Sequence, residues 1–564
     1  MRLIPVLSTL SASLLLLAAC QQESAKPDAE YYGTLEPFAE QAVYFVVTDR
    51  FVNGDESNDQ REQGGEQKTF DRPVPNAPEG MHANVGYLGG DFKGVLNNAD
   101  YIRGMGFSSV WITPIIDNPD AVFTGGKPVD WGSFWTDKGK TGYHGYWGVN
   151  FYKLDEHLPS ENLDFAAFTK GMHDKNLKVV LDIVGNHGSP AFTMPEDHPA
   201  FGKLYDKDGK LIADHQNLMP DQLDPENNPL HAFFNKKQEV AELADFNENN
   251  PAVLEYLTGA YLQWIDQGAD AFRIDTIGWM PHEFWKKFAD RIRAKHPGFF
   301  MFGEDFRWNA ADIAGHTLPQ NGGISVLDFP LKKALGELFE NAGSDYASVK
   351  DALYLENGPY ANPYELMTFY DNHDMARMNA SDEGFIDAHN WLFTARGIPV
   401  IYYGSEVGFM RGSAEHAGNR NYFGQERVEA APSHPIYQQL QRIAKVRAAS
   451  PALQRGLQLN VELQGDKAVF YRVLQHQGIN QIALVLLNKG DQPADFNVEQ
   501  FLQAGSWRSA LSGDVHSIGD GEALKTSVPA HGVEVLLLDA PVTRADMQQR
   551  LNELMQNKSA LLAR

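Results

Sequence analysis

Residues 250–275, NPAVLEYLTGAYLQWIDQGADAFRID, contain one complete repeat of a helix followed by a strand. Asn250 is a favourable N-cap residue, and Pro251 suits the first turn of a helix. Apolar residues then recur at helical spacing, at Leu254, Leu257, Tyr261 and Ile265. The stretch therefore predicts a helix over 251–266 and a buried strand over 271–274.

The same alternation of helices and apolar strands recurs over most of the chain. The apolar runs are mostly continuous rather than alternating, which is typical of parallel strands covered on both faces. They lie at 43–47, 108–112, 178–184, 271–274, 299–302, 324–329, 366–370 and 398–403. Eight strands are the number that a closed (β/α)8 barrel, or TIM barrel, requires. The fold class predicted is therefore α/β.

Two stretches interrupt the repeat. Residues 53–82 are rich in Gly, Asp, Asn and Pro and predict a long loop. The connection after the third strand, 188–242, is far longer than the usual ~2–6 residues, so we expect an inserted subdomain at about 188–245. Within it, Asp206-Lys207-Asp208-Gly209 predicts a hairpin turn.

The pattern changes from about residue 433. A helix reaches Arg447, and alternating short strands over 461–538 predict a separate antiparallel β domain, a β-sandwich. An amphipathic stretch over 543–557 predicts a closing helix that docks on a neighbouring domain. We therefore expect the catalytic barrel at 35–432, the helix and β domain at 433–540, and the closing helix within 541–564.

The first residues predict export and lipid anchoring. Arg2 precedes an apolar run that is too short to span a bilayer comfortably, so 1–19 is predicted to be a signal peptide. Leu17-Ala18-Ala19-Cys20 resembles the bacterial lipobox, in which the cysteine sulfur receives a diacylglycerol. The alternative is an ordinary signal peptide, but Cys20 is the only cysteine and cannot form an intrachain disulfide. Gln21, directly after this cysteine, favours the outer membrane as the place of anchoring. Residues 20–34 are predicted to form the lipid anchor and the linker to the first domain.

Composition limits the partners. The chain has 74 acidic and 48 basic residues, a net charge of −26, which repels polyanions and argues against nucleic-acid binding. A neutral partner fits better, and the many aromatic residues could line a groove as well as a core. We expect a monomer.

Polar side chains stand at the ends of five predicted strands, where barrel enzymes carry their reactive groups. In chain order they are Asp182, Asn186 and His187; Arg273 and Asp275; Glu304; Asn372, His373 and Asp374; and Tyr403 with Gly404. Any one set could cap or turn the chain, but five in register predict an active site.

Two of these carboxylates suit acid–base chemistry. Arg273 and Asp275 are two residues apart, so on a strand they point to the same side, where the guanidinium would keep Asp275 ionised as a nucleophile. Glu304 follows the apolar run 299–303, which should raise its pKa, as suits a general acid. Two such carboxylates about 5–5.5 Å apart would define a retaining glycosidase.

Four ordered segments resemble the signature regions of the α-amylase family. They are Asp182–His187 (DIVGNH), Phe272–Asp275 (FRID), Phe302–Glu304 (FGE) and Phe369–Asp374 (FYDNHD). Supporting matches lie at 106–114, 243–247, 397–404 and Tyr143–Trp147 (YHGYW), the last resembling the segment that stacks on the sugar at the cleavage site. The resemblance implies the family's barrel, inserted subdomain and β domain over about 35–540.

The resemblance also implies residue roles. Asp275 would be the nucleophile, Glu304 the acid/base, and Asp374 the third carboxylate, which binds and distorts the sugar. The residues implied to contact that sugar are His144, Tyr146, His187, Arg273 and His373. A structural role is the alternative for His187 and His373.

Calcium is the implied ion, a hard cation that takes several oxygen ligands. Asn186 and Asp245 match positions that bind calcium between barrel and inserted subdomain. A second cluster resembles a site of cyclodextrin-forming relatives and comprises Asn53, Asp55, Asn58, Asp59, Gly89 and Asp91. The alternative for this second cluster is a solvated polar loop.

One departure from the family bears on the reaction. Many members carry Lys-His three and four residues after the nucleophile, on the leaving-group side, whereas this chain has Gly278 and Trp279. We predict hydrolysis of α-1,4-linked starch or maltodextrins by retaining double displacement. Glucanotransfer, or the forming or degrading of cyclodextrins, is the alternative. A non-catalytic starch-binding protein is disfavoured because all three carboxylates are present.

Overall fold

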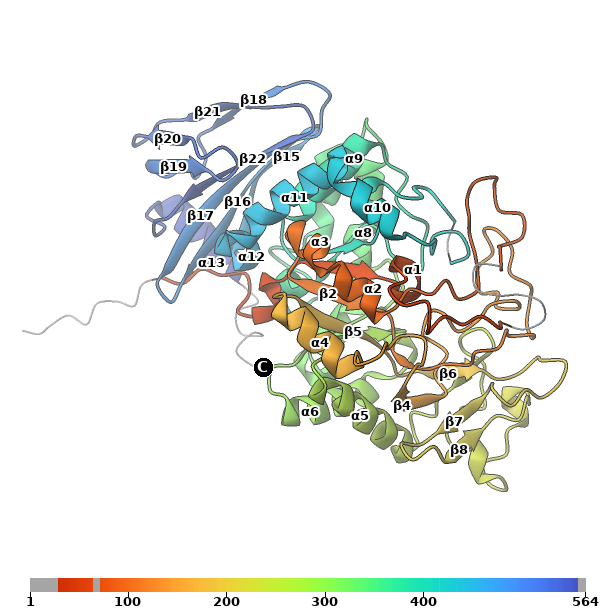
Figure 1. Cartoon of the computed structure of the whole chain (residues 1–564). Coiled ribbons are helices and arrows are strands. Elements are labelled where there is room, and N and C mark those ends of the chain that lie inside the picture. Colours follow the sequence, from red (N-terminus) through yellow and green to blue (C-terminus); the bar gives the residue numbers. More distant parts are fainter. Residues whose placement is uncertain (1–28, 64–71, 415, 556–564) are drawn as a thin grey trace, which may run out of the picture.

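Eight parallel strands form a barrel at the centre of the molecule (Figure 1). The computed structural model describes residues 29–63, 72–414 and 416–555. The strand order is β12-β11-β10-β5-β2-β1-β14-β13, and a parallel bridge between Leu327 and Met367 joins the two outer strands. The strands are β1 (Val43–Val46), β2 (Ser109–Ile112), β5 (Lys178–Val184), β10 (Ala271–Asp275), β11 (Phe300–Gly303), β12 (Ser325–Val326), β13 (Met367–Thr368) and β14 (Ile398–Tyr402). The predicted (β/α)8 barrel is confirmed.

Helices surround this barrel. The predicted helix over 251–266 is confirmed as α5 (Pro251–Asp266), with the Asn250 side chain accepting a hydrogen bond from the Ala252 N–H. Its apolar stripe, which includes Leu257 and Tyr261, is buried against the strands. The other helices before the C-terminal domain are α1 (Thr48–Phe51), α2 (Phe92–Asn97), α3 (Ala99–Gly104), α4 (Phe165–Asp174), α6 (His282–Lys295), α7 (Ala310–Ile313), α8 (Phe329–Phe339), α9 (Asp382–Leu392) and α10 (Gln425–Ala430).

Two predicted strands prove shorter. The prediction of a strand over 324–329 is wrong at its end, because β12 stops at Val326 and α8 begins at Phe329. The Asp328 side chain accepts a hydrogen bond from the Leu331 N–H, and a proline lies in the first turn of α8. This local capping turns the chain into a helix before the apolar run ends. Strand β13 likewise covers only part of the predicted 366–370.

The connection after β5 forms the predicted inserted subdomain. It contains β6 (His187–Pro190) paired with β9 (Leu243–Asp245), and β7 (Lys203–Tyr205) paired with β8 (Leu211–Asp214), all antiparallel. The predicted hairpin turn joins β7 to β8, where Asp206 accepts two backbone hydrogen bonds and Gly209 has a φ of 76°. A small pair, β3 (Ile116–Asp117) and β4 (Asn150–Leu154), lies beside the barrel.

The C-terminal part is an antiparallel β domain, as predicted. Helices α11 (Pro435–Ala448) and α12 (Pro451–Arg455) lead into a six-stranded sheet of order β15-β16-β17-β22-β19-β20, on which β18 and β21 pack as a separate pair through a shared core. The strands are β15 (Leu457–Gln464), β16 (Lys467–His476), β17 (Ile479–Asn488), β18 (Ala494–Val498), β19 (Gly505–Ser509), β20 (Val515–Ile518), β21 (Leu524–Val528) and β22 (Gly532–Leu538). The closing helix α13 (Ala545–Leu554) buries Met547, Leu551 and Leu554 in that core.

The predicted signal peptide and Cys20 lie outside the described residues. In the described part of the chain, no helix combines the length and the apolar character needed to cross a bilayer.

Candidate active site

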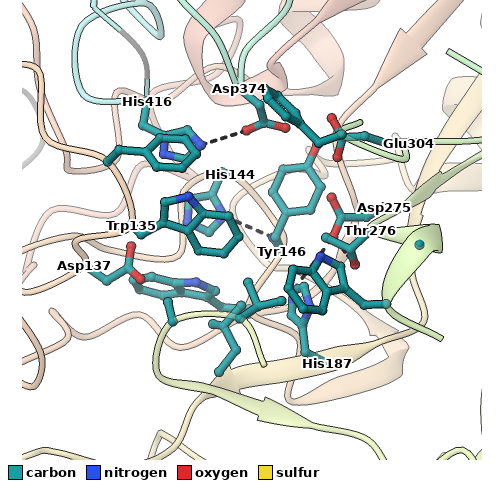
Figure 2. Close-up of a pocket in the computed structure, with 18 of the residues that line it drawn as sticks. Trp135, Asp137, His144, Tyr146, His187, Asp275, Thr276, Glu304, Asp374 and His416 are labelled. Carbon is teal, nitrogen blue, oxygen red and sulfur yellow. Dashed lines mark hydrogen bonds and ion pairs between the residues drawn. The ribbon is translucent and has the colours of Figure 1, made fainter. Parts of the chain in front are cut away.

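A pocket of about 530 Å³ lies at the carboxyl ends of the barrel strands. Asp275 ends β10, and Glu304 directly follows β11. Figure 2 shows these carboxylates and Asp374 on one wall, facing Tyr146 and the ring of Trp135. Aromatic residues make up much of the lining, including Phe134, Trp135, Tyr146, Trp147, Trp279 and Phe306. Aromatic faces beside a few polar groups suit a neutral sugar.

The Arg273 guanidinium joins the reactive carboxylates. Its Nη1 donates to Asp182 Oδ1 and to Asp275 Oδ1, both at 2.9 Å, and its Nη2 lies 2.6 Å from Glu304 Oε2. Arg273 is fully buried, so a single cation, removed from water, contacts carboxyl groups from three strands. As predicted, Arg273 and Asp275 project to the same side of β10.

Glu304 lies in surroundings that oppose its ionisation. Burial raises the pKa of the Glu304 carboxyl well above its ordinary range, and the charges of Asp374 and Asp275 add to this rise, while Arg273 opposes it. Its Oε1 is buried and has no hydrogen-bond partner among the described residues. This oxygen can therefore carry a proton toward a bound ligand.

Asp374 has the opposite character. Burial alone would raise the pKa of Asp374, but His373, His416 and Arg420 together hold it well below its ordinary range. Arg420 Nη2 lies 2.6 Å and His416 Nε2 3.1 Å from Oδ1, and His373 Nε2 lies 3.2 Å from Oδ2. Asp374 is therefore an ionised acceptor next to a carboxyl group that favours its protonated form.

Tyr146 is held rigidly in the wall. Its hydroxyl lies 2.8 Å from Asp182 Oδ2 and 2.7 Å from His373 Nε2. The Tyr146 N–H donates to His144 Nδ1 at 3.1 Å. His187 Nε2 lies 4.0 Å from Asp275 Oδ2. Every residue predicted to act on or bind the sugar therefore lies in or directly against this pocket.

Sequence reasoning missed one contact and undervalued another. His416 received no role, although it bonds to Asp374 and stacks flat on Phe134 with ring centroids 5.0 Å apart. From the sequence, Arg420 in Gly418-Asn419-Arg420 could bind a more distant sugar or be an exposed loop arginine, but the structure buries it and bonds it to Asp374. Both residues lie on a loop after β14, more than forty positions beyond Asp374. No periodic pattern or spacing could have identified them.

The first predicted calcium cluster is assembled between β5 and β9. Asn186 Nδ2 donates to Asp245 Oδ1 at 2.9 Å, and Asn235 Nδ2 donates to Asp245 Oδ2 at 2.8 Å. Burial raises the pKa of Asp245 to about 8. The two predicted residues are thus in contact, and a buried carboxyl group that accepts from two amides lies between barrel and subdomain.

The second predicted cluster also comes together, except for one side chain. Asn53 Nδ2 donates to Asp59 Oδ1 at 2.7 Å, and Asn58 Nδ2 donates to Asp91 Oδ2 at 3.3 Å. A Cβ at Gly89 would lie 2.4 Å from Asp59 Oδ1, so only glycine fits there. The Asp55 carboxylate instead accepts from Ser57 and Lys93, at 2.6 and 3.4 Å.

Comparison with known proteins agrees with this geometry. A family model for the α-amylase catalytic domain matches residues 45–431. The chain belongs to the α-amylase family. It is 30% identical over 529 residues to a cyclomaltodextrin glucanotransferase of Niallia circulans, covering 90% of this chain and 68% of that one. It is 28% identical over 546 residues to an α-amylase of the same organism, and the match covers 93% of this chain and 95% of that one.

Solved structures show the same mixture of activities. A cyclomaltodextrin glucanotransferase with three domains superposes with a TM-score of 0.71 at 31% identity, covering 89% of this chain and 99% of that one. An α-amylase of Anoxybacillus superposes with a TM-score of 0.67 at 25% identity, and the match covers 90% of this chain and 99% of that one. The chain is thus a glucan-active enzyme of a family that contains both hydrolases and transferases.

Proposed function

We propose that the protein is a retaining α-glucan hydrolase that cleaves α-1,4-glucosidic bonds of starch or maltodextrins. The observation that carries this proposal is the Arg273 guanidinium, which holds Asp275 and Glu304 on its two terminal nitrogens at 2.9 and 2.6 Å. Both carboxyl groups contact this cation, but burial and the neighbouring carboxylates raise the pKa of Glu304 in spite of it. Such a pair supplies a nucleophile and an acid.

In the first step Asp275 attacks the anomeric carbon, and the bond to the leaving oxygen breaks as Glu304 gives that oxygen its proton. In the second step Glu304, now a carboxylate, takes a proton from water, which attacks the same carbon and releases Asp275. Asp374, ionised and close to both, accepts hydrogen bonds from hydroxyls of the sugar being cleaved. Tyr146 stacks on that sugar, and His144, His187 and His373 surround it.

Glucanotransfer is the second candidate, because cyclomaltodextrin glucanotransferases are among the most similar proteins. It uses the same residues, with a sugar hydroxyl replacing water in the second step. A non-catalytic starch-binding role accounts less well for the arrangement. Binding alone does not require a carboxyl group with a raised pKa, Glu304, beside one with a lowered pKa, Asp374.

We further propose calcium at both clusters. Asn186 and Asp245 would hold one ion. Asn53, Asn58, Asp59, Asp91 and the region of Gly89 would hold the other, with Asp55 as a weaker candidate. The fit rests on buried carboxylates with raised pKa, about 8 for Asp245 and about 6 for Asp91, and on Asn58 Oδ1, which is buried without a described partner. Among the described residues no group of three or more His, Cys, Asp or Glu side chains could hold a metal ion, so amide and backbone oxygens would supply the remaining ligands. The ion would act as a structural clamp.

We also propose export and lipid attachment through Cys20 in the outer membrane, on the basis of the lipobox-like segment. Near the start of the described residues, Tyr31 pairs with Gln475 at the end of β16. The chain that follows the proposed anchor therefore meets the β domain before it enters the barrel. Replacing Cys20 by serine should move the protein from the membrane to the soluble fraction of cells. An unchanged membrane fraction would contradict the anchor.

The decisive experiment incubates protein lacking the first twenty residues with maltoheptaose and follows product sizes over time. Only shorter sugars, absent with Asp275→Asn, would support the hydrolase. Longer or cyclic products appearing early would support the transferase. Equal activity of Asp275→Asn and wild type would refute the assignment of the nucleophile.

A further inference from the structure

An ion pair on one side of the pocket has no part in the steps above. Asp305 follows Glu304 directly, Arg307 lies two residues later, and both line the pocket together with Gly278 and Trp279. Glu304 protonates the leaving oxygen in the proposed reaction, so the groups beside it face the sugar that departs, and later the acceptor. Asp305, Arg307 and His316 are called the acceptor-side cluster below.

The cluster is rigid at its base. Arg307 Nε donates to Asp305 Oδ1 at 2.6 Å, Arg307 Nη2 contacts Oδ2, and His316 Nε2 lies 3.0 Å from the same Oδ2. Asp305 and His316 are buried, whereas the Arg307 side chain is 48% exposed. Burial would raise the pKa of Asp305, but the bonds from Arg307 and His316 leave it below its ordinary value. The two-point contact therefore fixes the plane of the guanidinium at the pocket edge.

Gly278 makes room for this arrangement. A Cβ at Gly278 would lie 2.8 Å from Asp305 Oδ1 and Cγ, closer than side-chain atoms approach. Any larger residue at this position would displace the Asp305 carboxylate and, with it, the guanidinium. Gly278, three residues after Asp275 at the end of β10, and the ion pair that follows the neighbouring strand β11 therefore depend on each other.

The cluster offers what a neutral sugar needs. The described hydrogen bonds of Arg307 use Nε and Nη2, so Nη1 is available to donate to a hydroxyl. Trp279 and Phe306, which line the same pocket, are 46% and 40% exposed, and their rings offer apolar faces for stacking. Glu304 Oε1, which is buried and has no hydrogen-bond partner among the described residues, adds a polar atom to the lining of the same pocket.

We infer that the Asp305–Arg307 pair, oriented by His316 and admitted by Gly278, binds the leaving-group glucosyl unit and afterwards the acceptor. Arg307 is therefore a specificity-determining residue, which sets how well a sugar competes with water in the second step. The inference rests on the proposed function and identifies the residues of one of its subsites.

The test compares a substrate that has glucosyl units on the acceptor side with one that has none there. Maltoheptaose places sugars on the acceptor side, whereas α-maltotriosyl fluoride carries only fluoride there. In Arg307→Ala, the ratio of kcat/KM for maltoheptaose to that for the fluoride should fall about tenfold, because a charge-assisted hydrogen bond is lost. Arg307→Lys should show a smaller fall, and Gly278→Ala should change the ratio in the same direction as Arg307→Ala. Arg291→Ala, an exposed arginine on α6, is the matched control and should keep the wild-type ratio.

Transfer supplies a second readout. With maltose added as acceptor, Arg307→Ala should form less transfer product per fluoride released than wild type does. An unchanged substrate ratio in Arg307→Ala and Gly278→Ala, including equal losses on both substrates, would overturn the inference. Failure of the wild-type protein to act on either substrate would instead refute the proposed function, and the subsite with it.

Discussion

Replacing Arg273 by methionine removes the cation shared by the pocket carboxylates. Asp182, Asp275 and Glu304 would remain buried, each having lost a contact of 2.6–2.9 Å. Deleting one partner of a buried ion pair costs about 3–5 kcal/mol. Because three carboxyl groups contact this guanidinium, we expect the free energy of unfolding to fall by an amount at the upper end of that range near neutral pH.

The loss should depend on pH. Burial already raises the pKa of Asp182 to about 7, while Arg273 opposes that rise, so removing Arg273 raises it further. A carboxyl group with a raised folded-state pKa stabilises the protein below its unfolded pKa, and this contribution disappears as the pH rises through the folded value. The loss in free energy of unfolding should therefore be smaller at about pH 5 than at about pH 8, by up to roughly 1.4 kcal/mol from Asp182, because pH 8 lies about one unit above its folded-state pKa of about 7.

Urea unfolding at both pH values, followed by circular dichroism, measures this difference. Arg291→Met is the control, since Arg291 forms an exposed pair with Glu255 and its loss should cost less than about 1 kcal/mol. A loss below about 1 kcal/mol for Arg273→Met, or equal losses at the two pH values, would refute the role of Arg273 as shared counter-ion.

Three further predictions concern separate parts of the molecule. Because burial raises the pKa of Glu304 above its ordinary 4.5, and the acid must be protonated, kcat/KM for maltoheptaose should persist well above that pH and fall only at higher pH. A pH profile with its alkaline limb near 4.5 would contradict this. Asn250→Ala removes the N-cap of α5 and should lower the free energy of unfolding by about 1 kcal/mol in urea titrations, and an unchanged midpoint would argue that the cap contributes nothing. Chelation with EGTA should lower the melting temperature by several degrees, and added calcium should restore it, because a bound ion stabilises only the folded state. Equal melting temperatures would argue against both calcium sites.

Much of the barrel could be predicted because its signals are local. Strands covered on both faces are apolar throughout, so runs such as 178–184 stand out in the sequence, and α5 carries its own cap in Asn250. The error at 324–329 arose where two local signals overlap, since the apolar run continues into residues that Asp328 caps as a helix. Parallel strands also place their carboxyl ends at one edge, which is why Asp275, Glu304 and Asp374 could be predicted to lie together.

The sequence by itself therefore determined the barrel, the C-terminal β domain and the carboxylates at the strand ends. Only the tertiary structure decided how these groups are paired. The contact of Arg273 with Glu304, the bonds of His416 and Arg420 to Asp374, and the space that Gly278 leaves for Asp305 all join separate strands or loops. The physical reason is that such contacts depend on how the barrel closes and how its loops return, which no local spacing records. The raised pKa of Glu304 and the lowered pKa of Asp374 follow from those contacts, since burial and neighbouring charges act through space rather than along the chain.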